Sequence, residues 1–182
     1  EDKTIAIDYR EMAPKKAHRD MFLDKDGNVD NKKARFSHLS SGVPGTVAGL
    51  SYALEKYGTM SWKQVVMPAI KLAEQGILVS YDLSENLKSR KAWLTSNKAT
   101  ADAYFKAGGD AYQAGETLVQ SDLAWTLKRL AEKGPSEFYQ GEIAKRIVKD
   151  MAKNGGLITL DDMKSYKVAQ REAITTTYNG YQ

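Results

Sequence analysis

The chain has 182 residues, and its 27 Lys and Arg against 23 Asp and Glu give a net charge of +4. The basic residues lie in short groups and do not form the dense stripe that is typical of a nucleic-acid-binding surface. Hydrophobic residues make up 42% and charged residues 27%, a globular mixture that excludes a disordered or fibrous chain. The absence of Cys excludes thiol catalysis and disulfides in these residues, and no apolar run approaches the roughly 18–20 residues of a membrane span.

The chain opens with a predicted β-strand and continues with helices. Residues 4–10 are rich in β-branched and aromatic side chains, which favour a strand. Over residues 43–57 apolar side chains recur at helical spacing, and Gly58 is a typical helix end. A second helix is predicted over 61–76, where the missing amide donor of Pro68 predicts a kink or two short helices. Further helices are predicted after Ser80 and over 99–105, 121–134, 137–153 and 159–166.

The chain ends with a second predicted strand, over residues 173–178. It runs into Asn179-Gly180, a dipeptide typical of turns, and no partner strand follows it. The sequence also lacks an initiating Met. We therefore expect the chain to be part of a longer protein.

Residues 24–30, Asp-Lys-Asp-Gly-Asn-Val-Asp, place oxygen atoms at alternate positions, as calcium-binding loops do. The sixth position, where a calcium loop has Gly for a sharp turn, is Val29. The twelfth, where it has a bidentate Glu, is Arg35. The sequence therefore favours a polar turn here, and we expect no metal site.

The residues offer few candidates for nucleophilic catalysis. The two histidines, His18 and His38, are too far apart to share a helical face, and no carboxylate has metal-ligand spacing to either. No Gly-x-Ser-x-Gly elbow and no Gly-x4-Gly-Lys-Ser/Thr phosphate loop occurs. Ser40 and Ser41 precede a predicted helix and are typical of a cap and turn.

Arg10 is the candidate binding residue that stands out, because it ends an apolar strand. A guanidinium at a strand end can bind a carboxylate through two parallel hydrogen bonds. The spacing alone favours a salt bridge to Asp8, Glu11 or a neighbouring segment over a binding role.

Several segments of the sequence are similar to one protein family. Residues 7–14, Ile-Asp-Tyr-Arg-Glu-Met-Ala-Pro, resemble a signature stretch of the γ-glutamyltransferases (γ-glutamyltranspeptidases), and so do residues 42–49, Gly-Val-Pro-Gly-Thr-Val-Ala-Gly. The resemblance continues in the same order over residues 57–58, 68–76, 115–118, 122–127, 138–141, 155–159 and 178–181.

The resemblance implies an enzyme with an N-terminal nucleophile. In that family a precursor, or zymogen, cuts itself into a large and a small subunit and exposes a Thr at the new N-terminus of the small subunit. The Thr hydroxyl attacks the γ-glutamyl carbonyl of glutathione, with its own α-amine as the base. Backbone donors stabilise the oxyanion, and water or an amino acid or peptide then resolves the acyl-enzyme. No cofactor is implied.

The resemblance covers only the middle and later part of the large subunit. It therefore implies that the Thr lies beyond Gln182, that this chain holds no catalytic residue, and that the chain alone is inactive. One family residue maps onto the chain: Arg10 falls where the family's arginine binds the α-carboxylate of the γ-glutamyl group. The implied partners are glutathione and other γ-glutamyl donors, amino-acid or peptide acceptors, and the small subunit of the same precursor.

The fold implied by the resemblance is a piece of a four-layer αββα sandwich with an outer helical lobe. We expect an α+β, helix-rich chain that forms a single lobe, with a strand-and-turn segment over residues 1–42, a helical lobe over 43–166 and a returning strand over 167–182. The two terminal strands should lie side by side with exposed edges, because their other partners are missing.

Two other functions remain open at this point. The chain alone could be a non-catalytic helical binding or scaffold module. The whole protein could instead have a sister activity, such as poly-γ-glutamate cleavage or that of a cephalosporin acylase. Because bacterial members of the family are exported, the resemblance also implies a periplasmic or secreted protein.

Overall fold

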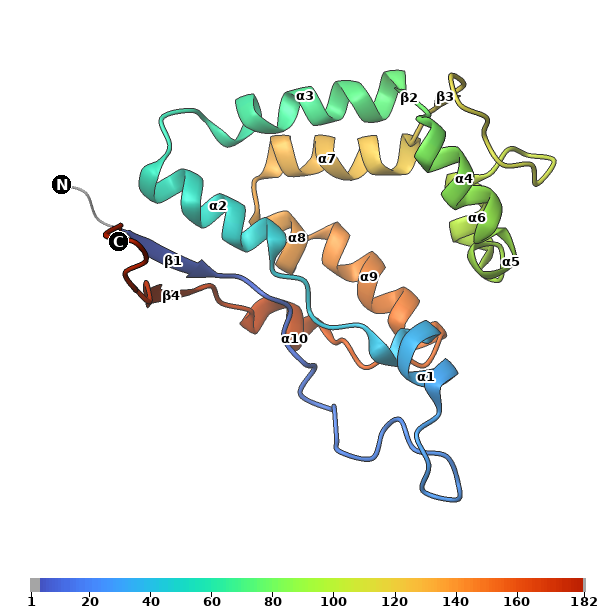
Figure 1. Cartoon of the computed structure of the whole chain (residues 1–182), viewed down its shortest axis with the longest axis horizontal. Helices are drawn as coiled ribbons and strands as arrows, with labels where there is room; N and C mark the ends of the chain where they lie inside the picture. Colours follow the sequence, from blue (N-terminus) through green and yellow to red (C-terminus); the bar gives the residue numbers. More distant parts are fainter. Residues whose placement is uncertain (1–3, 182) are drawn as a thin grey trace. The chain divides into compact units, whose positions relative to one another are not determined.

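The computed structural model describes residues 4–181 and has many helices and few, short strands (Figure 1). The α+β, helix-rich fold expected from the sequence is confirmed. The chain forms two compact units, one of Glu1–Trp62 with Lys133–Gln182 and the other of Lys63–Glu132. The division of a single lobe at residues 42 and 166 stays a sequence-based prediction.

The first unit contains the paired terminal strands and a group of helices around one hydrophobic core. Its elements are β1 (Ile5–Asp8), α1 (Asn31–Phe36), the 3-10 helix η1 (His38–Ser40), α2 (Thr46–Tyr57), α8 (Ser136–Gln140), α9 (Glu142–Lys153), α10 (Leu160–Ser165) and β4 (Ala169–Glu172).

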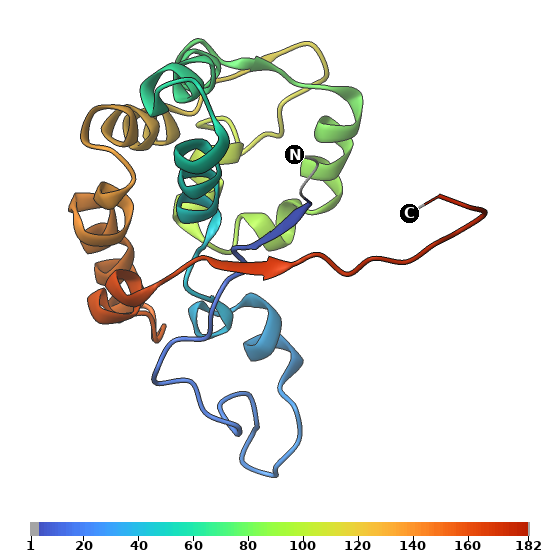
Figure 2. The same cartoon turned by 90° about the vertical axis from the view of Figure 1, so that its left-hand side faces the viewer.

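The strands near the two ends of the chain lie side by side, as the sequence predicted. β1 pairs antiparallel with β4, with Ile5 opposite Glu172 and Asp8 opposite Ala169. Figure 2 shows the pair, with the chain continuing beyond β4. The bounds predicted for the second strand, residues 173–178, are wrong, because β4 ends at Glu172.

The register explains why the returning strand comes earlier than predicted. Glu172 already lies opposite Ile5, the first residue of β1, so the residues after it extend past that strand. Ile174 is fully exposed there, since β-branched content does not form a strand without a partner. β1 is also shorter than the predicted 4–10, because the Asp8 side chain accepts a hydrogen bond from the Arg10 amide (3.2 Å) where the ladder ends.

The core of the first unit joins α8, α9 and α10 to the segment that precedes α2. Its buried residues are Val43, Tyr139, Ala144, Ile158 and Met163. Val43 also exchanges two backbone hydrogen bonds with Met12 (3.1 and 2.7 Å). The core therefore holds the chain that follows β1 beside the chain that leads into α2.

The helix predicted over residues 137–153 is two helices, α8 and α9, separated by Gly141 in an extended conformation. The buried Glu137 accepts a hydrogen bond from the Glu142 amide (3.0 Å), one of the amides that would lack a partner at the start of α9. A Cβ at position 141 would lie 2.0 Å from Oε2 of Glu137. The break thus depends on a glycine beside a buried carboxylate.

The start of α10 was predicted from the sequence and is a capping box. Oγ1 of Thr159 accepts from the Asp162 amide (3.2 Å), and Oδ2 of Asp162 accepts from the Thr159 amide and hydroxyl (2.8 and 2.6 Å). Oδ1 of Asp162 accepts from the Lys15 amide (2.9 Å). Burial alone would raise the pKa of Asp162, but these hydrogen bonds outweigh it and hold the pKa below 3.8.

The second unit is built from helices and one short two-stranded sheet. Its elements are α3 (Trp62–Gln75, the first residue of which belongs to the other unit), β2 (Ile77–Leu78), α4 (Tyr81–Ser89), α5 (Lys91–Leu94), α6 (Lys98–Tyr104), β3 (Thr117–Leu118) and α7 (Ser121–Lys133, the last residue of which belongs to the other unit).

Local signals predicted this unit well. Ser80 caps α4, since its Oγ accepts from the Leu83 amide (3.1 Å).

Of the two outcomes expected at Pro68, the division into two helices is wrong: α3 is one helix. The helix continues through Pro68, although a proline lacks an amide donor and crowds the carbonyl of the preceding turn. Buried Leu87, Phe105 and Ala111 form the core around α4 and α6.

Residues 24–30 form the polar turn that the sequence predicted. Oδ1 of Asp24 accepts from the amides of Asp26 and Asn28 (2.9 Å each), and Gly27 has a positive φ of 81°. Among the residues that the structure describes, no three His, Asp or Glu side chains are placed to share a metal ion. No described helix is long and apolar enough to cross a bilayer.

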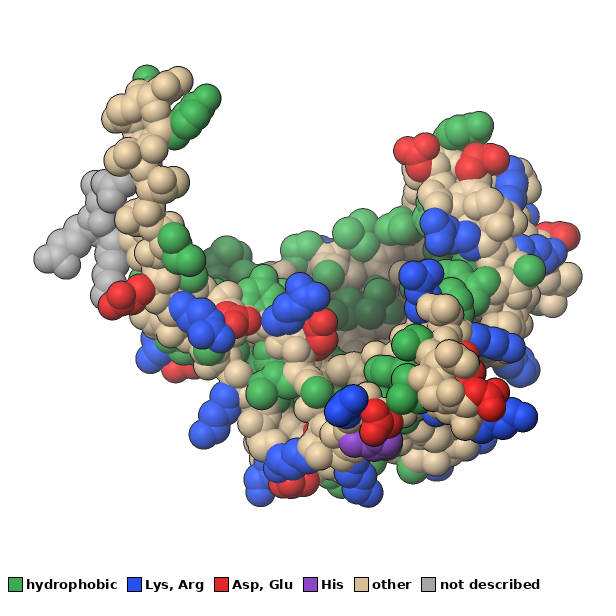
Figure 3. Space-filling model, turned by 60° about the horizontal axis from the view of Figure 1, so that its bottom comes forward, with side chains coloured by type: hydrophobic (Ala, Val, Ile, Leu, Met, Phe, Trp, Pro, Cys, Tyr) green, Lys and Arg blue, Asp and Glu red, His purple; other side chains and the backbone are tan. Residues whose placement is uncertain are grey.

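Charges of both signs are interspersed on the surface. On the face shown in Figure 3, Lys and Arg side chains lie among Asp and Glu side chains, with hydrophobic side chains between them. Examples of such neighbours are the ion pairs of Lys88 with Glu85 (2.8 Å) and Lys98 with Asp102 (2.6 Å). Neighbouring carboxylates thus partly neutralise the positive charge of the basic groups.

Replacing Asp162 with Ala should lower the free energy of unfolding by about 1–3 kcal/mol, because it removes a helix cap and leaves the Lys15 amide without its acceptor. The folded pKa of Asp162 lies below 3.8, so its contribution is present above that pH and is lost as the pH falls through the folded pKa. Urea denaturation at neutral and acid pH measures both effects.

Asp161→Ala is the matched control. Asp161 lies in the same helical turn, but its carboxylate makes an exposed ion pair with Lys15 (2.5 Å), a kind of contact worth at most about 1 kcal/mol. Equal losses in the two variants would show that the capping box is not what stabilises this region.

Candidate functional site

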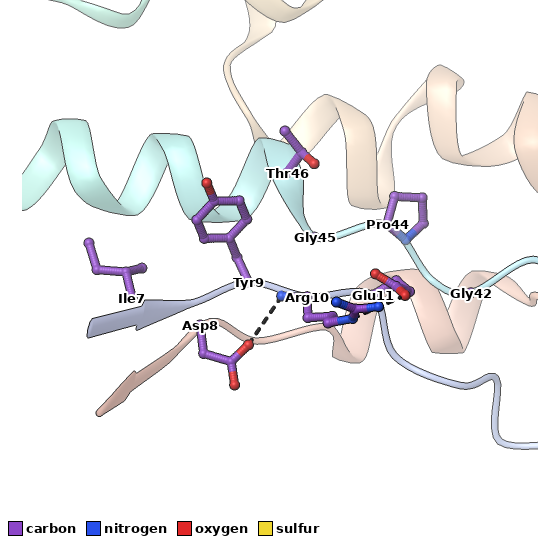
Figure 4. Close-up of a pocket in the computed structure, with 9 residues that line it drawn as sticks. All are labelled: Ile7, Asp8, Tyr9, Arg10, Glu11, Gly42, Pro44, Gly45 and Thr46. Atoms are coloured by element: carbon purple, nitrogen blue, oxygen red, sulfur yellow. Dashed lines mark hydrogen bonds and ion pairs between the residues drawn. The ribbon is translucent and has the colours of Figure 1, made fainter. Parts of the chain in front are cut away.

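An open cavity of about 610 Å³ lies where β1 ends and α2 begins (Figure 4). All of its walls belong to the first unit. The lining residues are Ile7, Asp8, Tyr9, Arg10, Glu11, Gly42, Pro44, Gly45 and Thr46. Two of the segments singled out in the sequence, residues 7–14 and 42–49, therefore meet at one site, although residues 15–41 separate them.

Arg10 lines this cavity with a guanidinium that is almost free of packing. Its side chain is 82% exposed, and its Nε lies 3.3 Å from Oε1 of Glu11. Of the salt-bridge partners considered from the sequence, Glu11 is therefore the one that the guanidinium contacts. An exposed pair of this kind contributes little free energy. Giving up the contact with Glu11 therefore costs little free energy, and the N–H donors of the guanidinium can then bind the carboxylate of another molecule.

The Asp8 carboxylate holds the backbone of Arg10 instead of its side chain. Oδ1 accepts from the Arg10 amide (3.2 Å), and Oδ2 accepts from Nε of Arg171 on β4 (2.9 Å), with Nη2 at 2.8 Å. The hydrogen bond from the Arg10 amide, followed by that from Arg171, lowers the pKa of Asp8 below its usual 3.8. Asp8 is thus a charged link between the site and the paired strand.

Tyr166 holds the other polar group of the Arg10 backbone. Its hydroxyl donates to the Arg10 carbonyl oxygen (2.9 Å), and its ring stacks on Tyr139, with the ring centres 5.7 Å apart and the planes at 14°. Burial raises the pKa of Tyr139 to about 12 and also raises that of Tyr166, so both hydroxyls are protonated at neutral pH.

Two glycines let α2 approach the strand segment closely. A Cβ at Gly45 would lie 2.0 Å from both the Tyr9 carbonyl oxygen and the Tyr166 hydroxyl, and a Cβ at Gly49 would lie 2.1 Å from the Tyr9 ring. Figure 4 shows the Tyr9 side chain directed toward α2. No signal in the sequence predicted these contacts of Tyr166, Gly45 and Gly49, although both glycines belong to a segment that carries the family resemblance.

The other candidates from the sequence lie away from this cavity. His38 contacts Asp150 through Nε2 and Oδ2 (3.0 Å). Ser40 belongs to η1, and its hydroxyl donates to the Ser37 carbonyl oxygen (2.7 Å). His18 is not a lining residue of the cavity. The structure therefore brings none of these side chains to Arg10.

Comparison with known proteins decides the family. The family model described as gamma-glutamyltranspeptidase matches residues 1–182, the entire chain. The chain belongs to the γ-glutamyltranspeptidase family. It is 52% identical to the glutathione hydrolase proenzyme of Escherichia coli (strain K12) over 179 residues, which are 98% of this chain and 31% of that protein.

Solved structures of the family have the same fold. The chain superposes on the γ-glutamyltranspeptidase of Helicobacter pylori with a TM-score of 0.95 and 46% identity, covering 97% of this chain and 51% of that one. A cephalosporin acylase from Bacillus halodurans is more distant, with a TM-score of 0.77 and 25% identity over 97% of this chain and 33% of that one.

The chain spans about a third of the length of its curated relatives in the γ-glutamyltranspeptidase family and about half of the H. pylori chain. These residues form one part of a protein of the γ-glutamyltranspeptidase family, and their cavity is lined by Arg10. The expected identity as a fragment of this family is confirmed.

Replacing Gly45 with Ala should lower the free energy of unfolding by about 1–3 kcal/mol, because the added methyl would collide with backbone and with the Tyr166 hydroxyl. Gly108→Ala is the matched control, since a Cβ there would meet nothing within 4 Å. Thermal or urea denaturation compares the two variants. A loss no larger at Gly45 than at Gly108 would contradict the close approach described here.

Proposed function

We propose that this chain is part of a γ-glutamyltransferase that cleaves the γ-glutamyl bond of glutathione and related compounds and transfers the acyl group to water, amino acids or peptides. The chain would supply the arginine that binds the α-carboxylate of the donor. The observation that carries the proposal is Arg10 itself: an exposed guanidinium, on a backbone held from both sides, at the wall of an open cavity.

The chemistry of the donor explains why an arginine would serve here. A γ-linked glutamyl group keeps its α-carboxylate free, whereas an ordinary peptide bond uses it. A guanidinium binds a carboxylate through two parallel N–H donors, which fixes orientation as well as position. Arg10 would thus select the γ-linked donor and set its carbonyl at a constant place relative to the nucleophile.

The bond-making step would use residues outside this chain. A Thr hydroxyl attacks the γ-carbonyl, its proton passes to the Thr α-amine, and the amine then protonates the leaving nitrogen as the C–N bond breaks. The ester that forms is resolved by water or by the amine of an acceptor. Donors to the oxyanion would likewise come from the remaining polypeptide.

Sequence identity favours this activity over that of a cephalosporin acylase. The glutathione hydrolase of E. coli is 52% identical to this chain, against 25% for the cephalosporin acylase. The acylase matches the fold, so it remains the second candidate for the whole protein. We also propose that the partner of this chain is the small subunit of the same precursor and that the protein is periplasmic or secreted.

Replacing Arg10 with Ala in the full-length protein should raise KM for a γ-glutamyl anilide about tenfold to a thousandfold, equivalent to about 1.4–4 kcal/mol, because the donor carboxylate loses its charged partner. Arg10→Lys should lose less, since it keeps the charge but not the paired donors. Steady-state kinetics with a γ-glutamyl p-nitroanilide measure both effects.

Arg19→Ala provides the matched control for Arg10→Ala. Arg19 is 95% exposed and, like Arg10, pairs with the acidic residue that follows it, here Asp20 at 3.6 Å. Its replacement should leave KM unchanged. If KM were also unchanged in Arg10→Ala, the proposed role of Arg10 would have to be abandoned.

The scaffold alternative is tested with the chain by itself. We expect residues 1–182 alone to release no p-nitroaniline from the anilide, and the precursor that contains them to release it. Turnover by the chain alone would contradict the placement of the nucleophile outside these residues.

A further inference from the structure

Packing restricts the Arg10 side chain little, because it is 82% exposed and, among the described residues, its one ion pair is with its neighbour Glu11. A long, exposed arginine has many rotamers, and restricting it costs conformational entropy. The backbone of Arg10 therefore determines which positions the guanidinium can reach. What holds that backbone should influence how well a carboxylate is bound.

Both polar backbone groups of Arg10 are held by side chains, although the residue lies outside β1. Its amide donates to Asp8 from the adjoining strand (3.2 Å), and its carbonyl oxygen accepts from Tyr166 (2.9 Å), 156 positions away in the sequence. In a strand, neighbouring backbone would make these hydrogen bonds. Here two side chains replace them and leave the cavity beside Arg10 open.

Tyr166 is itself firmly held. Its ring stacks on Tyr139, whose hydroxyl donates to the Pro44 carbonyl oxygen (2.9 Å) and accepts from the Ala48 amide (3.1 Å). The Tyr166 hydroxyl also fills the space beside Gly45. The two rings therefore connect the first turn of α2, through the core, to the carbonyl of Arg10.

Within the part of the chain that the structure describes, the Tyr166 hydroxyl makes one hydrogen bond, to the Arg10 carbonyl oxygen. Its pKa is raised, first by burial and then by the charges of Asp8 and Glu11, so it remains a donor at neutral pH. A phenylalanine at position 166 would keep the stacked ring and remove this one bond. The hydroxyl can thus be tested separately from the packing.

We propose that Tyr166, fixed by its stacking on Tyr139, is a positioning residue that orients Arg10 toward the α-carboxylate of the donor through the Arg10 carbonyl. This inference rests on the proposed function of Arg10. Its consequence is specific: the hydroxyl of Tyr166 matters only for donors that carry the carboxylate that Arg10 binds.

The experiment uses the full-length enzyme with Tyr166→Phe, in the wild-type background and in the Arg10→Ala background. Two donors are compared: a γ-glutamyl p-nitroanilide and a 4-aminobutyryl p-nitroanilide, which keeps the amine but lacks the α-carboxylate. Tyr52→Phe is the matched control, because it removes a tyrosine hydroxyl that bonds Gln170 on β4 (2.7 Å) and not Arg10. Thermal unfolding checks that each variant is folded.

We expect Tyr166→Phe to lower kcat/KM for the γ-glutamyl donor roughly three- to tenfold, mainly through KM, as loss of one hydrogen bond would. Turnover of the 4-aminobutyryl donor should not change. In the Arg10→Ala background the same substitution should cause no further loss, and Tyr52→Phe should stay within about twofold of wild type.

The inference would be overturned, with the proposed function intact, if Tyr166→Phe caused no loss of kcat/KM. It would also be overturned if the loss were the same with both donors, or the same in the Arg10→Ala background as in the wild-type background. Equal losses would mean that Tyr166 only stabilises the fold. Failure of the proposed function itself is distinct, since Arg10→Ala alone would then bind the γ-glutamyl donor normally.

Discussion

The candidate site depends on one ionic link between segments from opposite ends of the chain. The Asp8 carboxylate accepts from Arg171 with one oxygen and from the Arg10 amide with the other. Because Asp8 and Arg171 lie on one face of the two-stranded sheet, the register that pairs β1 with β4 also brings these charges together. A shift of one residue would place the Asp8 carboxylate on the face opposite Arg171 and break this ion pair.

Local chemistry explains most of what the sequence predicted correctly. Helix starts at Ser80 and Thr159 follow from side chains that bond their own helix, and the end of α2 at Gly58 follows from a residue that stops helices. The errors arose where strand register or burial in the folded chain decides the outcome. The bounds of β4 depend on the register with β1, and the break at Gly141 depends on where a buried carboxylate lies.

The same distinction applies to the site. Arg10 could be singled out because its type and its place after a strand carry chemical meaning. Tyr166 could not, since its role comes from an approach to Arg10 that only the folded chain creates. Gly45 and Gly49 stood in the sequence as part of a glycine-containing segment, but the collisions that make them necessary involve Tyr9, far away in the chain. Residue type and position singled out Arg10, and the contacts that hold its backbone come from the folded chain.

The pairing of β1 with β4 has a consequence for the order of folding. The two strands close a loop of roughly 160 residues. Closing such a loop costs conformational entropy, which is offset only by the contacts that form once the strands have paired. During synthesis the helices between them can form as they leave the ribosome, whereas Arg171 emerges long after Asp8. Arg10 therefore acquires its final surroundings late, so that a truncated or stalled chain would carry the guanidinium without the contacts that Tyr166 and Arg171 provide.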